Sequence, residues 1–392
     1  MSHKYTPKAI FFDAETLVRE ASLRRDLPAD YKLARLFLLS YSHSKDTYNT
    51  YRREIERFCQ WVWYVKKGAI LEADRSTIAD YIAFFQAPPS SWVAQQNYPR
   101  FVDNNGICEA NPLWRPFVVK PGKERQVSQS GMKSLLACLS TFFSFLVHEG
   151  ELQQNPVARL AQKRQLVQTH QQKRVKRRFS HIQWDYVIRI AQLMADDNPR
   201  YERQLYLLSM FYLLGVRISE VSQTERSYKA MNAFYQDAHQ RWWFEAHGKG
   251  NKLRDVAVPD AMLESLSRYR LSIGQSPLPD AADTSPLVPK HRGMGGLSAR
   301  QVRALVSEMF QHAIDALVRD GHVNDANMMR HATVHWLRHT SISVDVAERP
   351  SEHVRDDVGH ENIATTSLYI DVLDESRHAS ARHKTLIPND ED

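Results

Sequence analysis

The sequence has few cysteines and no long apolar run. Its 392 residues include three cysteines, Cys59, Cys108 and Cys138, which are scattered along the chain. An odd number of isolated cysteines predicts free thiols in a reducing compartment rather than a disulfide framework. No run approaches the roughly 18–20 apolar residues of a membrane span, and the start MSHKYTPK lacks a signal-peptide core. We therefore expect a soluble, cytoplasmic protein without a membrane partner.

The sequence also lacks a glycine-rich nucleotide loop. The turn HGKGN at 247–251 contains a Gly-Lys-Gly triplet but not the spacing GxxxxGK[ST] of a P-loop. The stretch GMGG at 293–296 precedes a helical pattern but follows no clear strand, which predicts a plain loop. Neither stretch predicts a nucleotide site.

Basic residues are in excess. Lys and Arg total 52 against 45 Asp and Glu, a formal charge of +7, and 43% of the residues are hydrophobic. This length and composition predict about two domains with real cores. A basic surplus is consistent with a polyanionic partner such as nucleic acid.

Helical periodicity dominates both halves of the chain. The clearest apolar patterns predict helices at 30–40, 50–67, 77–85, 132–148 and 297–317. Two strand-like runs flank the turn HGKGN and predict a hairpin over 241–259. The stretch 87–121, rich in Pro, Asn and aromatic residues, predicts an irregular insertion. The fold class expected is mainly α with a small antiparallel β-sheet.

A basic segment separates the halves. Residues 163–178, KRQLVQTHQQKRVKRR, contain seven Lys or Arg and no acid, and SHIQ at 180–183 has the spacing of a helix capping box. The segment is either a solvated linker or an arm against a phosphate backbone, for which the candidate contacts are Lys173, Arg174, Lys176, Arg177 and Arg178. The expected parts are an N-terminal extension (1–40), a helical domain (41–162, with the insertion 87–121), the linker (163–179), a second domain (180–376) and a tail (377–392).

The stretch VHWLRHT at 334–340 suggests two kinds of site. In a helix, His335 and Arg338 share a face, which suits an anion. His331, His335 and His339 follow one another at i, i+4 steps, which suits a metal. The box by itself leaves both readings open.

The order of several boxes resembles one family. LLGVRISEV contains Arg217, the hairpin tip contains Lys249, His335-x-x-Arg338 follows, and Gly-His360 precedes Tyr369 by nine residues. This order and spacing resemble the tyrosine recombinases, also called the phage integrase family. The stretch STFFSFLVHEGELQQNPVARL is similar to the end of the family's helical core-binding domain. The resemblance implies a core-binding domain followed by an α+β catalytic domain.

The resemblance also implies roles for individual residues. The implied catalytic set is Arg217, Lys249, His335, Arg338, His360 and Tyr369. Glu220 would orient the first arginine, Lys252 would meet a neighbouring phosphate, and His339 would be structural. The family needs no cofactor or metal for strand exchange, acts on double-stranded DNA, and works as four protomers on two DNA sites through a Holliday junction. Such a protein would be cytoplasmic and bound to the nucleoid in a bacterial cell.

Chemistry accounts for these residue types. A tyrosine that attacks DNA conserves the phosphodiester as a 3′-phosphotyrosine link. The free phenol has a pKa near ~10, so nearby cations and a proton acceptor must assist its ionisation. Two guanidinium groups present fixed forks of donors to phosphate oxygens, where charge develops in the transition state.

Some features differ from the family pattern, and other functions remain open. Val334 stands where a proline often precedes the box histidine, and ERPSEHV at 348–354 replaces the usual glycine turn and apolar helix. Residues 1–40 lack the strand pattern of an arm-binding domain. The alternatives are a type IB-like topoisomerase and a catalytically idle DNA-binding protein of the same fold.

Overall fold

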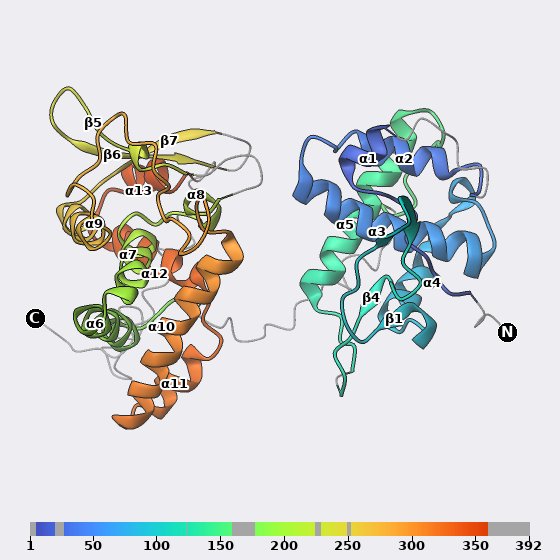
Figure 1. The fold of residues 1–392 in the computed structure, drawn as a ribbon. Coiled ribbons are helices and arrows are strands. Elements are labelled where there is room, and N and C mark those ends of the chain that lie inside the picture. The colour runs from blue at the N-terminus through green and yellow to red at the C-terminus, as the bar shows by residue number, and fades with distance from the viewer. Residues whose placement is uncertain are drawn as a thin grey trace, which may run out of the picture. The chain divides into compact units, whose positions relative to one another are not determined.

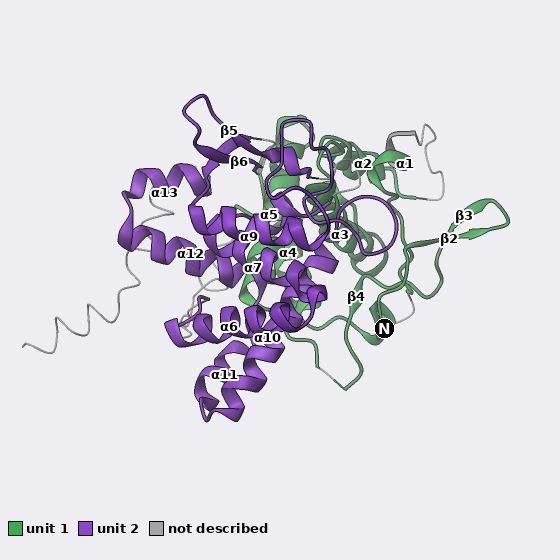
Figure 2. Ribbon diagram, turned by 60° about the vertical axis from the view of Figure 1, so that its left-hand side comes forward, with its two compact units in different colours: residues 1–173 green, residues 174–392 purple. Residues whose placement is uncertain are grey.

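The computed structural model describes residues 5–19, 27–122, 124–158, 177–223, 229–248 and 252–359. The chain divides into two compact units, unit 1 (1–173) and unit 2 (174–392) (Figure 2). The division falls within the segment expected to be a linker, most of which lies outside the described residues. Several residues singled out from the sequence also lie outside them, namely Lys173, Arg174, Lys176, Lys249, His360 and Tyr369.

Unit 1 is a group of helices around an aromatic core. Its helices are α1 (Ala14–Arg19), α2 (Tyr31–Leu39), α3 (Lys45–Trp61), α4 (Arg75–Gln86) and α5 (Gln129–His148). In the core, the rings of Phe37 and Phe142 lie edge to face at 5.1 Å, and those of Phe58 and Phe143 at 5.6 Å. The helices predicted at 50–67, 77–85 and 132–148 are confirmed as α3, α4 and α5 with shifted ends; α3 continues into a π-helical turn, Val62–Lys66.

The first forty residues are part of the unit 1 core. The sequence predicted one helix there, whereas the structure has both α1 and α2. Phe11 and Phe37 are fully buried in the core cluster of unit 1. The Tyr48 hydroxyl on α3 donates to the carbonyl of Phe12 at 2.8 Å. The described part of this segment, residues 5–19 and 27–40, is therefore packed into unit 1.

The insertion 87–121 is more regular than its composition predicted. It contains β1 (Val93–Ala94) paired in parallel with β4 (Phe117–Val118), and an antiparallel hairpin of β2 (Phe101–Asn104) and β3 (Ile107–Ala110). The hairpin projects from unit 1 (Figure 2). Arg57 on α3 donates to the Pro116 carbonyl at 2.9 Å, and Arg100 pairs with buried Glu56. These polar contacts, which composition does not reveal, hold the insertion against α3.

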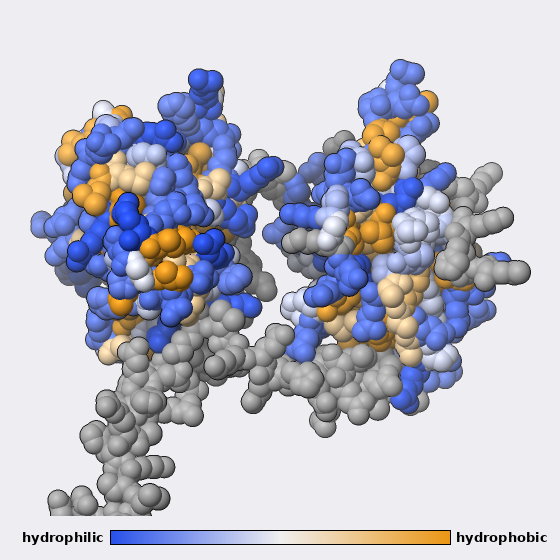
Figure 3. Space-filling view, turned by 90° about the horizontal axis from the view of Figure 1, so that it is seen from below, coloured by the Kyte–Doolittle hydropathy of each residue, from blue (hydrophilic) through white to orange (hydrophobic). Residues whose placement is uncertain are grey.

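Helix α5 is long and apolar enough to cross a membrane by length and composition. The prediction that no run approaches a membrane span is therefore wrong by that measure. The apolar face of α5 is buried in the core of unit 1 through Met132, Leu135, Leu136, Leu139, Phe142, Phe143 and Leu146. The visible surface of both units is mainly hydrophilic with small apolar patches (Figure 3).

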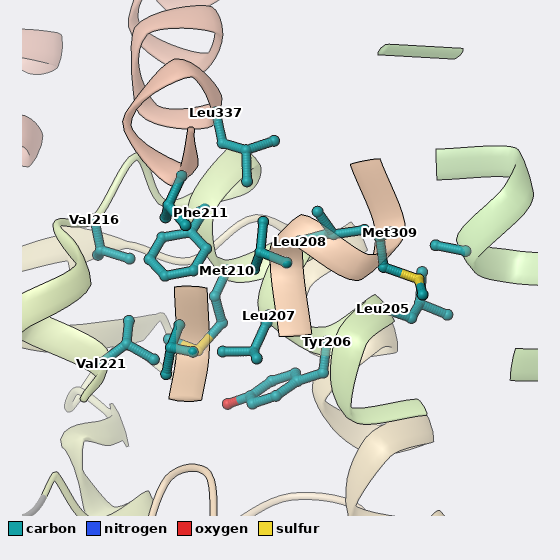
Figure 4. Close-up of a cluster of buried hydrophobic side chains, with 14 of the residues drawn as sticks. Leu205, Tyr206, Leu207, Leu208, Met210, Phe211, Val216, Val221, Met309 and Leu337 are labelled. Atoms are coloured by element: carbon teal, nitrogen blue, oxygen red, sulfur yellow. The ribbon is translucent and has the colours of Figure 1, made fainter. Parts of the chain in front are cut away.

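Unit 2 is built around the buried helix α7 (Glu202–Leu213). The elements before and after it are α6 (His181–Asp197), α8 (Ile218–Val221), α9 (Asp260–Ser272), α10 (Ala299–Arg319), α11 (Val323–Met329), α12 (Val334–Glu348) and α13 (Ser351–Val358). Helix α7 packs against α6, α9, α10 and α12, and its apolar side chains fill the centre of the core (Figure 4). The predicted capping box is present, because Gln183 N donates to Ser180 Oγ at 3.2 Å at the start of α6.

One antiparallel sheet accompanies these helices. It contains β5 (Phe234–Gln236), β6 (Trp242–His247) and β7 (Leu253–Ala257), in that order (Figure 1). The strands β6 and β7 form the predicted hairpin, with His247 opposite Leu253, and β5 adds a strand that was not predicted. The sheet brings β7 against α13, which connects it to the candidate site.

Candidate active site

The site begins at the break between α7 and α8. Gly215 has a left-handed backbone conformation, with φ +57°. A Cβ at this position would lie 3.1 Å from Ser341 Oγ on α12, closer than side chains normally allow. Glycine therefore lets the chain turn close to α12, and Arg217 follows directly before α8.

Glu220 holds Arg217 from within the protein. The Glu220 carboxylate is 0% exposed. Its Oε2 accepts from the backbone N of Arg217 at 2.6 Å, and its Oε1 accepts from Arg217 Nη1 at 3.2 Å. The side chain of Arg217 remains 30% exposed. A buried acid thus orients a guanidinium that is partly open to solvent.

A second arginine, which the sequence did not point to, reaches the same carboxylate. Arg254 on β7 donates from Nη1 to Glu220 Oε1 at 2.6 Å and from Nη2 to Oε2 at 2.9 Å. Burial alone would raise the pKa of Glu220, but the hydrogen bonds and charge of Arg254, the backbone hydrogen bond from Arg217 and the charge of Arg338 together hold the pKa below its ordinary value. Glu220 is therefore ionised between two arginines. The only sequence signal was a basic residue on the return strand of the hairpin, a place where arginines are usually solvated.

Arg338 joins two distant segments. It lies on α12, is 3% exposed, and donates from Nη1 to the Gly215 carbonyl and from Nη2 to the Val358 carbonyl at 2.7 Å. Arg217 Nη2 donates to the next carbonyl, that of Gly359, at 3.4 Å. The two arginines therefore meet at the end of α13, directly before His360. Three boxes that are far apart in the sequence converge here.

The segment ERPSEHV, which differs from the family pattern, is built into this arrangement. It begins at the end of α12 and forms the first turn of α13, where Val354 packs with Val358 against Ile342. Arg349 Nη2 donates to Asp357 Oδ2 at 2.5 Å and ties the turn to the end of α13. Local packing is thus maintained without the usual glycine turn.

His335 is exposed on α12, and its environment favours the neutral ring. Desolvation by the surrounding protein lowers the pKa of His335, and the positive charges of Arg338, Arg177 and Arg217 lower it further. At neutral pH the imidazole is therefore uncharged and able to accept a proton. Its ring lies 4.3 Å from that of His339, edge to face.

The histidine ladder predicted as a metal alternative is not on one helix. Helix α12 begins at Val334, and His331 lies in the turn that follows α11. His331 therefore does not share a helical face with His335 and His339, as the metal alternative requires. Within the described ranges no three His, Cys, Asp or Glu side chains are grouped closely enough to hold a metal ion.

The C-terminal end of the basic segment is fixed to α12. Phe179 is buried, with its ring 5.2 Å from Phe310 and 5.7 Å from Trp336, and its backbone N donates to Thr340 Oγ1 at 2.9 Å. This contact brings the exposed Arg177 close enough to influence the pKa of His335. Arg178, which lies between Arg177 and Phe179 in the sequence, is half-buried.

The hairpin lysine Lys252 is exposed, and its carbonyl accepts from Gly248 N at 2.8 Å across the base of the turn. Gly248 itself lies beside the Glu220–Arg254 pair, since a Cβ there would be 3.4 Å from Arg254 Nη1. Gly248, the last described residue before Lys249 in the sequence, therefore lies next to Arg254 and Glu220.

The chain is similar to known recombinases over most of its length. Residues 182–376 match the model of the phage integrase family. Tyrosine recombinase XerC of Bacillus subtilis is 25% identical over 273 residues, covering 69% of this chain and 80% of that protein. Tyrosine recombinase XerC of Vibrio cholerae serotype O1, strain O395, is 28% identical over 266 residues, covering 67% and 73%.

A solved structure shares the fold. The XerH site-specific recombinase, in a post-cleavage complex with palindromic difH substrate, superposes with a TM-score of 0.57 at 13% identity and covers 94% of each chain. The expected fold class, mainly helical with a small antiparallel sheet and a two-domain recombinase architecture, is confirmed. Residues 182–376 are therefore a phage integrase family domain, and the chain is a tyrosine recombinase, an enzyme that cuts and rejoins DNA strands.

Proposed function

We propose that the protein recombines DNA at specific sites with Arg217 and Arg338 holding the scissile phosphate and Tyr369 attacking it. One observation carries the assignment of residues. The two arginines come from separate boxes, yet both donate to consecutive carbonyls at the end of α13, at Val358 and Gly359. The next residue is His360, and Tyr369 follows nine residues later. The phosphate would therefore meet Arg217, the exposed face of α12 and the Gly-His box together.

The reaction exchanges one ester for another. The Tyr369 oxygen forms a bond to phosphorus while the bond from phosphorus to the 5′-oxygen breaks, leaving a 3′-phosphotyrosine and a free 5′-hydroxyl. Lys249 donates the proton that the leaving 5′-oxygen needs, and neutral His335 accepts the phenol proton. The guanidinium groups and His360 stabilise the charge that develops on the nonbridging oxygens. Attack by a 5′-hydroxyl from a partner strand reverses the step and rejoins the DNA.

Double-stranded DNA is the substrate, and its backbone suits the basic surface beside the site. Arg177, held near His335 by the buried Phe179, and Lys252, exposed at the hairpin, would contact phosphates beside the scissile one. Lys173, Arg174, Lys176 and Arg178 would extend this contact along the linker. Four protomers on two DNA sites would exchange strands through a Holliday junction. The protein would then act on DNA in the bacterial cytoplasm, where it would serve a mobile element or a chromosome.

Covalent trapping tests the proposal. The probe is a nicked duplex that carries the site the protein selects from a random-sequence library, so that the short strand is lost after cleavage and the adduct accumulates. Wild type should form a protein–DNA adduct on a denaturing gel, and Tyr369→Phe should bind the duplex equally but form none. Tyr186→Phe is the matched control, because it loses an exposed hydroxyl that hydrogen-bonds to Asp320, just after the end of α10, rather than to any candidate site residue. An adduct that persists in Tyr369→Phe would assign the nucleophile to another residue.

A second assay separates the enzyme from a topoisomerase of the same chemistry. A recombinase should resolve a synthetic Holliday junction built from two selected sites and assemble on it as a tetramer. Relaxation of supercoiled plasmid by a monomer, without junction resolution, would instead favour the topoisomerase.

A further inference from the structure

We propose that Arg254 is a positioning residue for strand cleavage, and that it acts by occupying Glu220 so that Arg217 remains available to the DNA phosphate. This inference rests on the proposed function, in which Arg217 holds the scissile phosphate. Arg254 acts through the protein, because each of its three side-chain nitrogens donates to a protein acceptor: Nη1 and Nη2 to the Glu220 carboxylate, and Nε to the Asp357 carbonyl.

The geometry at Glu220 is unequal. Arg254 forms a two-pronged pair with the carboxylate, with N–O distances of 2.6 and 2.9 Å. Arg217 contributes one side-chain bond at 3.2 Å. A fork-to-fork pair is the strongest arrangement that a guanidinium and a carboxylate can form. Arg254 forms this arrangement with Glu220, whereas the guanidinium of Arg217 has a single, longer hydrogen bond to Glu220 and remains partly exposed.

The charges lead to the same conclusion. Glu220 is fully buried and ionised, so its negative charge must be compensated by cations within reach. With two arginines the group has a net charge of +1, which is available to a phosphate. With Arg217 alone the pair would be neutral, and the two-pronged geometry on Glu220 would be open to Arg217. Removal of Arg254 should therefore draw Arg217 inward and cancel its charge.

Arg254 also fixes the end of α13. Its Nε donates to the Asp357 carbonyl at 2.7 Å. Its Cδ lies 3.0 Å from the position that a Cβ of Gly359 would occupy, and Gly359 has φ +64°. The Arg217 side chain donates to two acceptors, Glu220 Oε1 and the Gly359 carbonyl. Arg254 contacts the residues that carry both of these acceptors and so holds them in place. A lysine has one nitrogen and cannot make these three bonds at once.

A double-mutant series tests the mechanism on the nicked duplex described above. The variants are Arg254→Met, Glu220→Gln, and the two combined, with single-turnover cleavage rate and duplex Kd measured for each. Arg254→Met should lower the cleavage rate about 100-fold, the size expected when one preorganised donor is lost, with a much smaller change in Kd. Adding Glu220→Gln should recover about tenfold or more of that rate, because a neutral amide no longer draws in Arg217.

Controls separate positioning from folding. Arg268→Met breaks a comparable pair, Arg268 Nη2 to Glu202 Oε1 at 2.7 Å, between α9 and the start of α7. It should lower thermal stability and leave the cleavage rate of the folded protein unchanged. Arg254→Lys, which keeps the charge but not the fork, should cleave at an intermediate rate. If Arg254→Met does not fold, Arg254→Lys with and without Glu220→Gln gives the same comparison.

The outcomes are distinct. Failure of wild type to form any adduct would overturn the proposed function itself. A wild-type adduct together with an Arg254→Met rate equal to wild type would overturn only the role of Arg254. Equal rates for Arg254→Met and its Glu220→Gln double variant would also overturn it, because they would show that Glu220 does not capture Arg217.

Discussion

Replacement of Gly215 by alanine should disturb both stability and cleavage. Gly215 occupies the left-handed region, where an alanine costs about 1–2 kcal/mol. The added Cβ would also lie 3.1 Å from Ser341 Oγ, and moving that side chain off its rotamer costs about 0.5–1.5 kcal/mol. Together these terms predict a decrease of about 1.5–3.5 kcal/mol in the free energy of unfolding.

The steric part of this decrease can be isolated. Among the described residues the buried Ser341 hydroxyl has no hydrogen-bond partner, so Ser341→Ala alone should change stability little. The double variant Gly215→Ala/Ser341→Ala should then recover the rotamer contribution and retain the backbone cost of about 1–2 kcal/mol. Urea unfolding followed by circular dichroism measures the three variants.

The cleavage rate of Gly215→Ala should fall by more than the loss of folded protein can explain. The Gly215 carbonyl accepts from Arg338, so a shift of the backbone there displaces one of the two carbonyls that hold this arginine. Gly215→Ala should therefore cleave the nicked duplex slowly at a temperature where it is fully folded. Unchanged stability and cleavage in Gly215→Ala would refute the argument, as would a double variant no more stable than the single one.

Three other outcomes are expected. Asp345→Asn should raise the free energy of unfolding at pH 8 but not near pH 4. Burial raises the pKa of Asp345 to about 6, so the stability that its protonated form contributes is lost as pH rises through that value. Equal effects at both pH values would contradict this. Lys249→Ala should cleave ordinary DNA slowly and recover on a substrate whose bridging 5′-oxygen is sulfur, a leaving group that needs little protonation, whereas rescue of Lys252→Ala alone would transfer the role to Lys252. The last prediction concerns the salt dependence of DNA binding after the basic residues of the linker are neutralised together, namely Lys173, Arg174, Lys176, Arg177 and Arg178. The slope of log K against log salt should then become shallower by about 0.9 for each DNA phosphate that the protein no longer neutralises. An unchanged slope would mean that the linker faces solvent.

Most helices and the hairpin were predictable because each has a local signature. The period of apolar residues predicts α3, α4, α5 and α10, and the turn HGKGN between strand-like runs predicts β6 and β7. The break at Gly215 and the cap at Ser180 are also local, since one residue type at one position determines the backbone there.

The features that were missed depend on contacts between distant segments. Composition predicted an irregular stretch at 87–121 because its strands are too short to show an alternating apolar pattern. They are instead held by contacts with α3, in which Arg57 donates to the Pro116 carbonyl and Arg100 pairs with Glu56. The pairing of Arg254 with Glu220 joins residues 34 positions apart, and no periodicity predicts it. His331 has the i, i+4 spacing of the metal alternative in the sequence, but it lies in a turn three residues before α12 begins, which spacing alone cannot reveal. The order of the boxes pointed to Arg217 and Arg338, and the structure shows the hydrogen bonds that bring these two residues to the end of α13.

The attachment point of the DNA tests the central claim most directly. The covalent complex formed by wild type on the nicked duplex is digested with protease, and the DNA-linked peptide is sequenced by mass spectrometry. The proposed mechanism predicts a single linked peptide that contains Tyr369, with the 3′-phosphate on that residue. Attachment at any other residue, or through a 5′-phosphate, would contradict the account.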